Sequence, residues 1–160
     1  MKLIVAAVGR LKPGPERALQ EHYCERIGNQ GRPVHLSPLE IIELTESRDK
    51  SAGVRKANEA KRLLEATATA SYRVALDERG KAHDSRSFAN VLARHRDGGA
   101  SGLAFMLGGP DGHARDLLES SDTRLTLSAM TLPHGLARLV LLEQIYRAMT
   151  ILAGHPYHRS

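Results

Sequence analysis

The sequence predicts an α/β fold with a mostly parallel sheet, in a single domain that spans residues 1–160. Short apolar runs alternate with longer stretches whose apolar residues recur at helical spacing. One run, Leu103–Leu107, is apolar without interruption, which suits a strand buried on both faces of a parallel sheet. A chain of 160 residues can bury roughly 70% of the surface that it exposes when unfolded, so no second domain is needed.

Two strand and helix pairs are expected in the first half of the chain. The first loop contains two glycines and two prolines, and the first helix carries Leu19, Tyr23 and Ile27 on one face. The expected elements are a strand at Leu3–Val8, a loop at Gly9–Pro15, a helix at Glu16–Ile27 that Gly28–Pro33 ends, a strand at Leu39–Leu44, a polar loop at Thr45–Lys50 and a helix at Ala52–Ala66.

The second half continues the alternation. A strand at Tyr72–Leu76 is expected to end at Asp77–Gly80, and a helix at Ser85–Arg96 to begin at a cap formed by Asp84 or Ser85. Further strands are expected at Leu103–Leu107 and Thr123–Leu127. Pro133 favours the first turn of a last helix, which runs from His134 to about Ala153, contains the i,i+4 pair of Glu143 and Arg147, and stops at Gly154 and Pro156.

Composition restricts the partners and the compartment. The chain has 23 basic and 18 acidic side chains, a net charge of +5, which favours polyanions without choosing among RNA, DNA and anionic lipid. The basic stretch from Arg48 to Arg62 is either a solvated helix face or part of an RNA footprint, and we favour the solvated face. Cys24 stands alone, which excludes an internal disulfide and fits a reducing interior. The amino terminus has neither a cleavage signature nor a membrane-length span, which predicts a cytoplasmic protein without a membrane partner.

A glycine-rich loop, Gly108-Gly109-Pro110-Asp111-Gly112, follows the fully apolar strand. Glycines let the backbone adopt positive φ and let a ligand approach the main chain, while Pro110 stiffens the turn. An ordinary turn between a strand and a helix has the same composition. The spacing fits neither a dinucleotide fingerprint nor a phosphate-binding P-loop.

Four motifs follow one another in the last third of the chain. They read GGPDG from Gly108, LTLSAMTLPH from Leu125, LLEQIYRA from Leu141 and GHPYHR from Gly154. In this order, and together with Lys2–Gly9 and Val74–Lys81, they resemble the ribosomal RNA large subunit methyltransferase H family of the SPOUT class over the whole chain. The resemblance implies an S-adenosylmethionine-dependent methyltransferase that modifies N3 of the pseudouridine at position 1915 of 23S rRNA, in helix 69 of assembled ribosomes, and not DNA.

The same resemblance implies a Rossmann-like sheet whose carboxy-terminal segment threads a deep trefoil knot, and a homodimer. The knot would form the cofactor pocket. The residues that match the family's cofactor site are Leu76, Gly108, Leu127, Ser128, Ala129, Met130, Thr131 and Leu132. Without the resemblance, Leu76 and Leu127 would be read as core leucines at strand ends. The chain departs from common relatives at Asp111 and at His113 and Ala114.

Substrate-side chemistry is expected near the carboxy terminus, where the family's tail docks against the partner subunit. Methyl transfer to an imide nitrogen needs alignment and the loss of a proton, for which histidine and arginine are suited. The candidates for catalysis are His134, Arg138, Arg147, His155, Tyr157, His158 and Arg159. No metal is expected, because no carboxylate accompanies His155 and His158. Two other functions stay open: a non-catalytic ribosome-binding factor with this fold, and a phosphate-handling enzyme that uses the glycine-rich loop.

Overall fold

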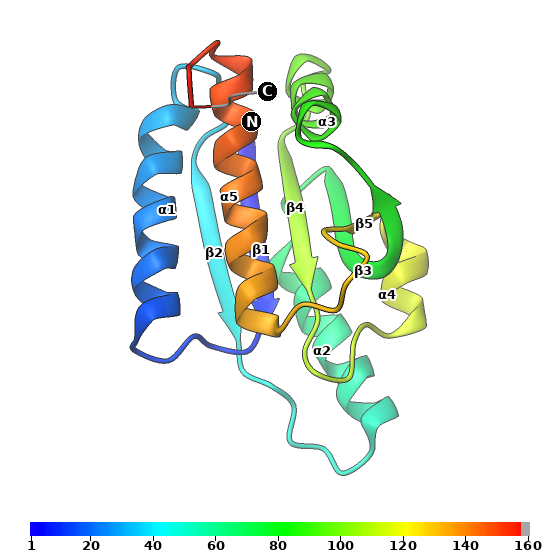
Figure 1. Ribbon diagram of the computed structural model, residues 1–160. Helices are drawn as coiled ribbons and strands as arrows, with labels where there is room; N and C mark the ends of the chain where they lie inside the picture. Colours follow the sequence, from blue (N-terminus) through cyan, green and yellow to red (C-terminus); the bar gives the residue numbers. More distant parts are fainter. Residues whose placement is uncertain (158–160) are drawn as a thin grey trace.

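A computed structural model describes residues 1–157, in which five parallel strands form one sheet with helices on both faces (Figure 1). The expected α/β class with a parallel sheet is therefore confirmed. In chain order the elements are β1 (Lys2–Val8), α1 (Pro15–Gly31), β2 (Leu39–Leu44), α2 (Ala52–Ala66), β3 (Tyr72–Ala82), α3 (Ser85–Asp97), β4 (Gly102–Leu107), α4 (Arg115–Ser120), β5 (Thr123–Thr126) and α5 (His134–Leu152).

The strands lie in the order β2-β1-β4-β3-β5, so β2 and β5 are the edge strands and β4 lies at the centre. Leu3 of β1 lies opposite Leu39 of β2 and Leu103 of β4. All six residues of β4 are buried, which is why its sequence is apolar without alternation. Successive side chains of β1 enter different cores, since a strand points them alternately to the two faces.

One core lies between the sheet and α1, α3 and α5, and it contains Leu3, Val5 and Phe105. The other lies under α2 and α4 and contains Ala6 and Met106. Figure 1 shows α1 and α5 side by side in front of the sheet, with α2 behind it. The two apolar faces of the sheet are thus both covered, and the carboxyl ends of the strands all point to one edge.

Two helix caps follow from the sequence. The Ser51 hydroxyl accepts a bond from the Val54 amide (3.5 Å), and the Asp84 carboxylate accepts one from the Ser87 amide (2.7 Å). Each satisfies one of the amides that the first turn of a helix leaves without a partner. Of the two expected caps of α3, Asp84 is the residue used.

Two expected boundaries are wrong, and one short helix was not expected. Helix α1 continues through Gly28 to Gly31, because packing of Ile27 holds a turn that a glycine disfavours by only about 1 kcal/mol. Helix α4 was not expected, since its six residues are too short to show a helical period. Strand β3 does not end at Asp77–Gly80 but continues to Ala82.

The register of β3 is nevertheless interrupted where the end was expected. Leu76 and Lys81 both lie opposite Leu125, so the residues between them bulge out of the ladder. A Cβ on Gly80 would lie 2.5 Å from the Leu125 carbonyl carbon, so only glycine allows this approach of two backbones. Beyond Ala75, β3 no longer pairs with β4, and the gap between the two strands opens the sheet edge.

The chain crosses back over this edge after β5. The segment from Leu127 to Pro133 leads from the outer strand to the start of α5, which packs against α1 and α3 (Figure 1). Whether this crossing threads a knot stays a prediction from the resemblance. Within residues 1–157 no helix is both long and apolar enough to cross a membrane.

Candidate functional site

A cleft of about 540 Å³ opens at the carboxyl edge of the sheet. It is bounded by the bulge of β3 (Leu76–Arg79), the loop after β4 (Leu107–His113) and the crossing segment at Thr131 and Leu132. A second hollow of about 110 Å³ adjoins it and shares Leu76, Asp77 and Leu132. Ligands of open α/β sheets bind at this edge, where loops leave the strands.

Most of the expected cofactor residues line these two hollows. Leu76 and Leu132 line both, Gly108 and Thr131 line the larger, and Leu127, Ser128 and Met130 line the smaller. Ala129 lies between them in the chain but does not line either. The structure thus brings together residues from three separate loops, as the sequence predicted, while their contact with a cofactor stays a prediction.

The crossing segment keeps its shape through Ser128. The Ser128 hydroxyl accepts a bond from the Met130 amide (2.9 Å), and its carbonyl accepts one from the Thr126 hydroxyl (2.9 Å). Met130 is 79% exposed. An exposed methionine beside a cleft offers an adaptable apolar contact.

The glycine-rich loop is tied to α2 by an ion pair that the sequence did not reveal. Arg55 Nε lies 2.7 Å from Asp111 Oδ2, and the second nitrogen lies 3.1 Å from Oδ1. The same guanidinium donates to the carbonyls of Asp49 and Lys50. The hydrogen bond from Arg55 lowers the pKa of Asp111. Arg55 therefore links the loop after β2 to the cleft, which no spacing rule could indicate across 56 residues.

His113 forms the floor of the cleft where β3 and β4 separate. Its Nε2 lies 3.2 Å from the Met106 carbonyl, an acceptor at the end of β4. Burial lowers its pKa, so the neutral ring donates this bond. The sequence marked His113 only as a departure from relatives.

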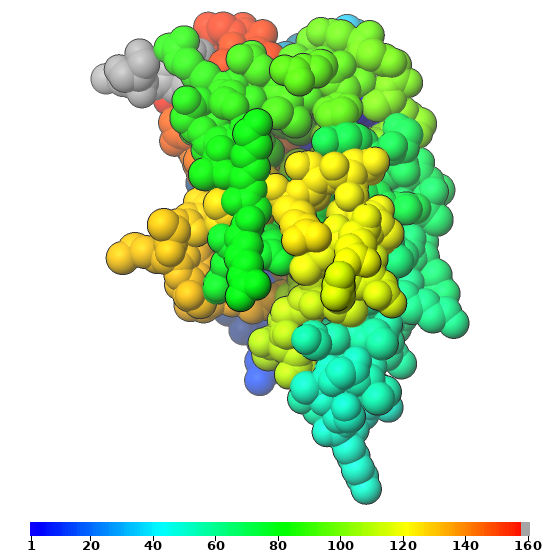
Figure 2. Space-filling view, turned by 90° about the vertical axis from the view of Figure 1, so that its right-hand side faces the viewer, coloured from blue at the N-terminus to red at the C-terminus, as the bar shows by residue number. Residues whose placement is uncertain are grey.

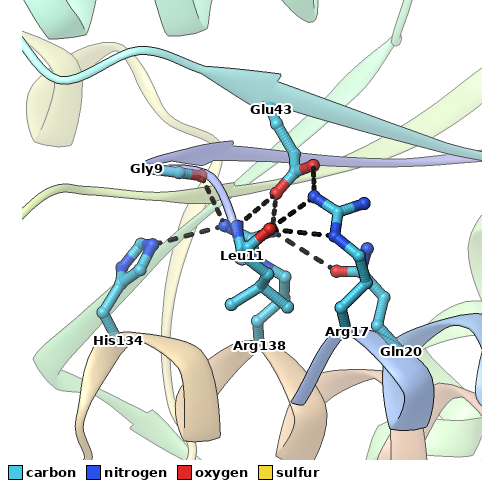
Figure 3. Close-up of polar contacts among 7 residues, drawn as sticks. All are labelled: Gly9, Leu11, Arg17, Gln20, Glu43, His134 and Arg138. Carbon is cyan, nitrogen blue, oxygen red and sulfur yellow. Dashed lines mark hydrogen bonds and ion pairs between the residues drawn. The ribbon is translucent and has the colours of Figure 1, made fainter. Parts of the chain in front are cut away.

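Arg138 lies in a buried polar network beneath the cleft (Figure 3). It has no exposed surface, and it donates to Glu43 Oε2 (2.6 Å), the Gly9 carbonyl (2.7 Å) and Gln20 Oε1 (3.3 Å). A guanidinium without surface cannot contact an RNA in this conformation. The expectation that Arg138 faces the substrate therefore finds no support in the geometry.

Glu43 holds the centre of this network. It also accepts bonds from the Leu11 amide (2.8 Å) and from Arg17 (3.1 Å). Burial alone would raise the pKa of Glu43, but the bonds from Leu11, Arg138 and Arg17 outweigh it and lower the pKa. The signal for this cluster in the sequence, a glutamate in an apolar strand, is too weak to identify a partner 95 residues away.

His134 connects the network to the cleft, which it lines. Its Nε2 lies 3.3 Å from Arg138 Nη2, and its ring packs on Gly9. Burial, and next to it the charge of Arg138, lower the pKa of His134. Of the expected catalytic residues, it alone reaches the cleft within the described part of the chain.

Three other expected catalytic residues, Arg147, His155 and Tyr157, lie at the far end of α5. Arg147 pairs with Glu143 (2.6 Å) and lies over the ring of Tyr157 (5.1 Å), as the i,i+4 spacing predicted for the ion pair. Tyr157 packs edge-on against Tyr146, while His155 is exposed. His158 and Arg159 lie outside the described residues. Among residues 1–157 no cluster of histidine, cysteine or acidic side chains could hold a metal.

Comparisons with known proteins cover the whole chain. The sequence model of a family described as predicted SPOUT methyltransferase matches residues 1–158. Ribosomal RNA large subunit methyltransferase H from Brucella anthropi is 48% identical over 160 residues, with 100% of both chains covered. The protein of the same name from a Bradyrhizobium species is 47% identical and covers 100% of this chain and 99% of its own.

Solved structures show the fold. A probable methylase family protein from Haemophilus influenzae superposes with a TM-score of 0.53 at 11% identity, covering 99% of this chain and 70% of its own. A probable methyltransferase from Bordetella pertussis superposes with a TM-score of 0.53 at 16% identity, covering 92% and 95%. At these identities the likeness concerns the arrangement of strands and helices alone.

Proposed function

Because this chain belongs to the ribosomal RNA large subunit methyltransferase H family of the SPOUT class, we propose that it transfers a methyl group from S-adenosylmethionine to ribosomal RNA. The finer assignment, N3 of the pseudouridine at position 1915 in helix 69 of assembled ribosomes, comes from the resemblance. The observation that carries the proposal is the cleft at which Leu76, Gly108 and the crossing segment meet.

The cleft fits a sulfonium nucleoside. A Cβ on Gly108 would lie 3.1 Å from the Gly112 carbonyl carbon, and one on Gly109 would lie 3.0 Å from Glu59 Oε2, so bare backbone lines the loop. Such backbone leaves amides and carbonyls free to read an adenine edge. Leu76 and Leu132 offer apolar walls, and the carboxylates of Asp77 and Glu78 line both hollows, which suits a positively charged ligand.

Bound in this cleft, the cofactor would supply an electrophilic methyl group. The protein's part is to exclude water, to orient that methyl, and to hold the RNA base in line with it. Positive charge near the cleft would favour loss of the imide proton and stabilise the resulting anion. Arg79 lines the cleft and can take this role.

A basic rim lies at the same edge of the sheet as the cleft and suits an RNA partner. We define it as the side chains that follow β1, β2 and the first half of β3 and that form no ion pair with described residues: Arg10, Lys12, Arg48, Lys50, Arg79 and Lys81. Figure 2 shows the loop after β2 projecting below the body of the protein. Cations at the mouth of a site bind phosphates by releasing their counterions.

The rim makes a measurable prediction. Replacing Lys12 and Lys50 by serine should weaken ribosome association and lower the slope of log affinity against log salt by about one for each lost phosphate contact. Lys61→Ser is the control, because Lys61 pairs with Glu65 on an exposed helix face. Equal slopes for the double variant and the control would remove the rim from the interface.

Candidate catalytic residues lie at both ends of α5, far from one another. This separation supports a dimer in which a second copy of the chain completes each site. His134 lies at the cleft and His155 beyond the other end of a helix of 19 residues, which spans about 28 Å. The tail of one copy therefore cannot complete its own cleft without a large rearrangement. We propose a homodimer in which each tail, from His155 onward, reaches the cleft of the partner subunit.

The test is mass spectrometry of rRNA fragments after incubation of unmodified ribosomes with the protein and S-adenosylmethionine. Gly108→Val should weaken cofactor binding in calorimetry, whereas deleting residues 155–160 should abolish methylation and leave cofactor binding intact. Gly28→Ala, on the outer part of α1 with no atom within 4 Å of the added Cβ, serves as a control. Ribosome binding without methylation would support a non-catalytic binding factor instead.

Mixing the two defective proteins tests the shared site. If each cleft works with the partner's tail, only heterodimers of the two variants contain an intact site, and a 1:1 mixture should regain about a quarter of wild-type activity. A mixture that stays inactive after subunit exchange would contradict the proposed arrangement.

A further inference from the structure

Arg138 makes more hydrogen bonds than a structural ion pair with Glu43 requires. One nitrogen is satisfied by Glu43, while the other donates to the Gly9 carbonyl and lies 3.3 Å from His134 Nε2 (Figure 3). Arg138 Nε has no hydrogen-bond partner among the described residues although it is buried. An unsatisfied buried donor is costly, so its retention calls for an explanation. The guanidinium is oriented so that Nη2 reaches the Gly9 carbonyl and His134, and Nε is left without an acceptor among the described residues.

The contact determines where the proton of His134 sits. An arginine stays protonated in proteins and its nitrogens only donate. His134 Nε2 must therefore be the acceptor, and the neutral ring carries its proton on Nδ1. His134 lines the same cleft as Gly108, and the Gly108 backbone favours the charged form of the ring, so the imidazole lies beside the glycine-rich loop.

Groups from four neighbouring elements face His134. Arg138 comes from α5, Glu16 from α1, Glu46 from the loop after β2 and the Gly108 carbonyl from the loop after β4. Burial and Arg138 disfavour the charged ring, while the other three favour it, and the first two prevail. Gly9, with φ +99, completes the enclosure, because a Cβ there would lie 2.9 Å from Nε2.

We propose that Arg138 is a positioning residue that locks His134 as the neutral Nδ1–H tautomer, so that His134 holds the glycine-rich loop in place and does not accept the proton of the imide. The proposal rests on the proposed function for its consequence in catalysis. The bonds themselves exist in the protein whether or not it methylates RNA. His134 thus moves from the candidates for acid and base chemistry to those that shape the cofactor cleft.

Nitrogen NMR of the wild-type protein tests the tautomer directly. Long-range ¹H–¹⁵N spectra, assigned by comparison with His134→Gln, should show a protonated Nδ1 and an unprotonated Nε2 across about pH 6 to 8. In Arg138→Lys, which keeps the charge but not the fork of donors, the ring should lose its single tautomer. A proton on Nε2 in the wild type, or a ring that is charged at neutral pH, would overturn the proposal without use of any variant.

Kinetics separate positioning from proton transfer. His134→Gln keeps an acceptor for Arg138 and cannot titrate near neutral pH, so any loss of activity should appear in KM for S-adenosylmethionine, and the pH profile of kcat should keep the wild-type shape. His134→Ala removes the acceptor and should raise KM for S-adenosylmethionine about tenfold with a smaller change in kcat. A His134→Gln protein that binds the cofactor normally but has lost turnover would identify His134 as the base.

The outcomes distinguish failure of this inference from failure of the proposed function. If the wild-type protein methylates no ribosome, the proposed function fails while the NMR result still decides the tautomer. If methylation occurs and the tautomer differs, the positioning role alone is wrong.

Discussion

The two ends of α5 are built in opposite ways. At its start, Arg138 is fully buried and bonds to Glu43 and the Gly9 carbonyl beneath the cleft. At its end, Arg147 and Glu143 are partly exposed; the Tyr157 ring lies against Arg147, and the Tyr157 hydroxyl donates to Glu143 Oε1 (3.4 Å). The comparison teaches that one helix carries a buried polar network at one end and solvent-accessible side-chain contacts at the other.

The two ends of α5 differ in how far their charged groups are exposed to solvent. A buried ion pair costs much when one partner is removed, because the other is left as an unpaired charge away from water. Ion pairs and cation–π contacts at the surface contribute little to stability but can hold a segment in place. Arg26 illustrates the second kind, since it lies 4.6 Å from the centroid of Tyr146 and 5.4 Å from that of Tyr157.

The largest effect should come from breaking the buried pair. Glu43→Ala leaves Arg138 without its carboxylate and should lower the free energy of unfolding by about 3 to 5 kcal/mol. Glu143→Ala at the other end should lower it by about 1 kcal/mol or less. Urea denaturation measures both, and equal losses would remove the contrast between the two ends.

Two glycines with positive φ offer a matched pair for the next effect. Gly9→Ala, in the loop after β1 that packs against the start of α5, adds strain at φ +99 and a clash with His134, so we expect a loss of about 2 to 3 kcal/mol. Gly154→Ala, just beyond its end, has φ +66 and no atom within 4 Å of the added Cβ, so about 1 kcal/mol of strain is expected. A loss at Gly154 as large as that at Gly9 would show that the contact with His134 costs nothing.

The pH dependence of stability should also separate the ends. His134 has a pKa below its ordinary 6.5 through burial and Arg138, so the unfolded chain binds its proton first as the pH falls. Its stabilising contribution is therefore present above about pH 6.5 and is lost as the pH falls toward the pKa of the folded state. The pKa values of His113 and His95 are lowered as well. The contribution of His134 is therefore obtained by subtracting the stability of His134→Gln from that of the wild type at each pH.

Glu43 adds a second phase at lower pH. Its pKa is held below the ordinary 4.5 in the folded protein, so stability is present above pH 4.5 and falls as the carboxylate is protonated. Urea midpoints between pH 3 and 8 would show both phases. A flat profile in the wild type would contradict the assigned protonation states.

The smallest change in stability is expected at the tail. Arg26→Ala removes a cation from the rings of Tyr146 and Tyr157 and should cost about 0.5 to 1 kcal/mol. Methylation should nevertheless fall, because the tail loses the surface that holds it. Arg32→Ala, at an exposed position just past α1, is the control. If both variants lose the same amount of methylation activity, Arg26 does not position the tail.

Much of the cleft followed from local pattern. The apolar run Leu103–Leu107 predicted the central strand, and the glycines after it predicted a loop open to a ligand. The bulge at Asp77–Gly80 was misread as the end of a strand. Its turn residues interrupt the pairing of β3 with β5 after Leu76, and the pairing begins again at Lys81. Such resumption depends on Gly80 meeting Leu125, a contact that turn chemistry does not encode.

Polar pairs between residues far apart in the chain could not be predicted from the sequence, for a related reason. Arg55 and Asp111 both stood out in the sequence, one as part of a basic stretch and the other as a departure from relatives, yet nothing joined them. Arg138 was expected at the substrate because arginine suits that task, whereas burial depends on which helix face meets the sheet. Arg138 lies four residues before Leu142 and seven before Ile145, on the buried face of α5, but this spacing does not identify Glu43 as its partner.

By itself the sequence determined the α/β class, the order of strands and helices, and the loops whose glycines and prolines would form a cleft. These depend on periodicity and backbone preference, which act over a few residues. Only the tertiary structure decided that Arg138 is buried, that its guanidinium lies beside His134, and that His155 lies a helix length from its own cleft. These depend on distances between residues far apart in the chain, which are set by how the helices pack on the sheet.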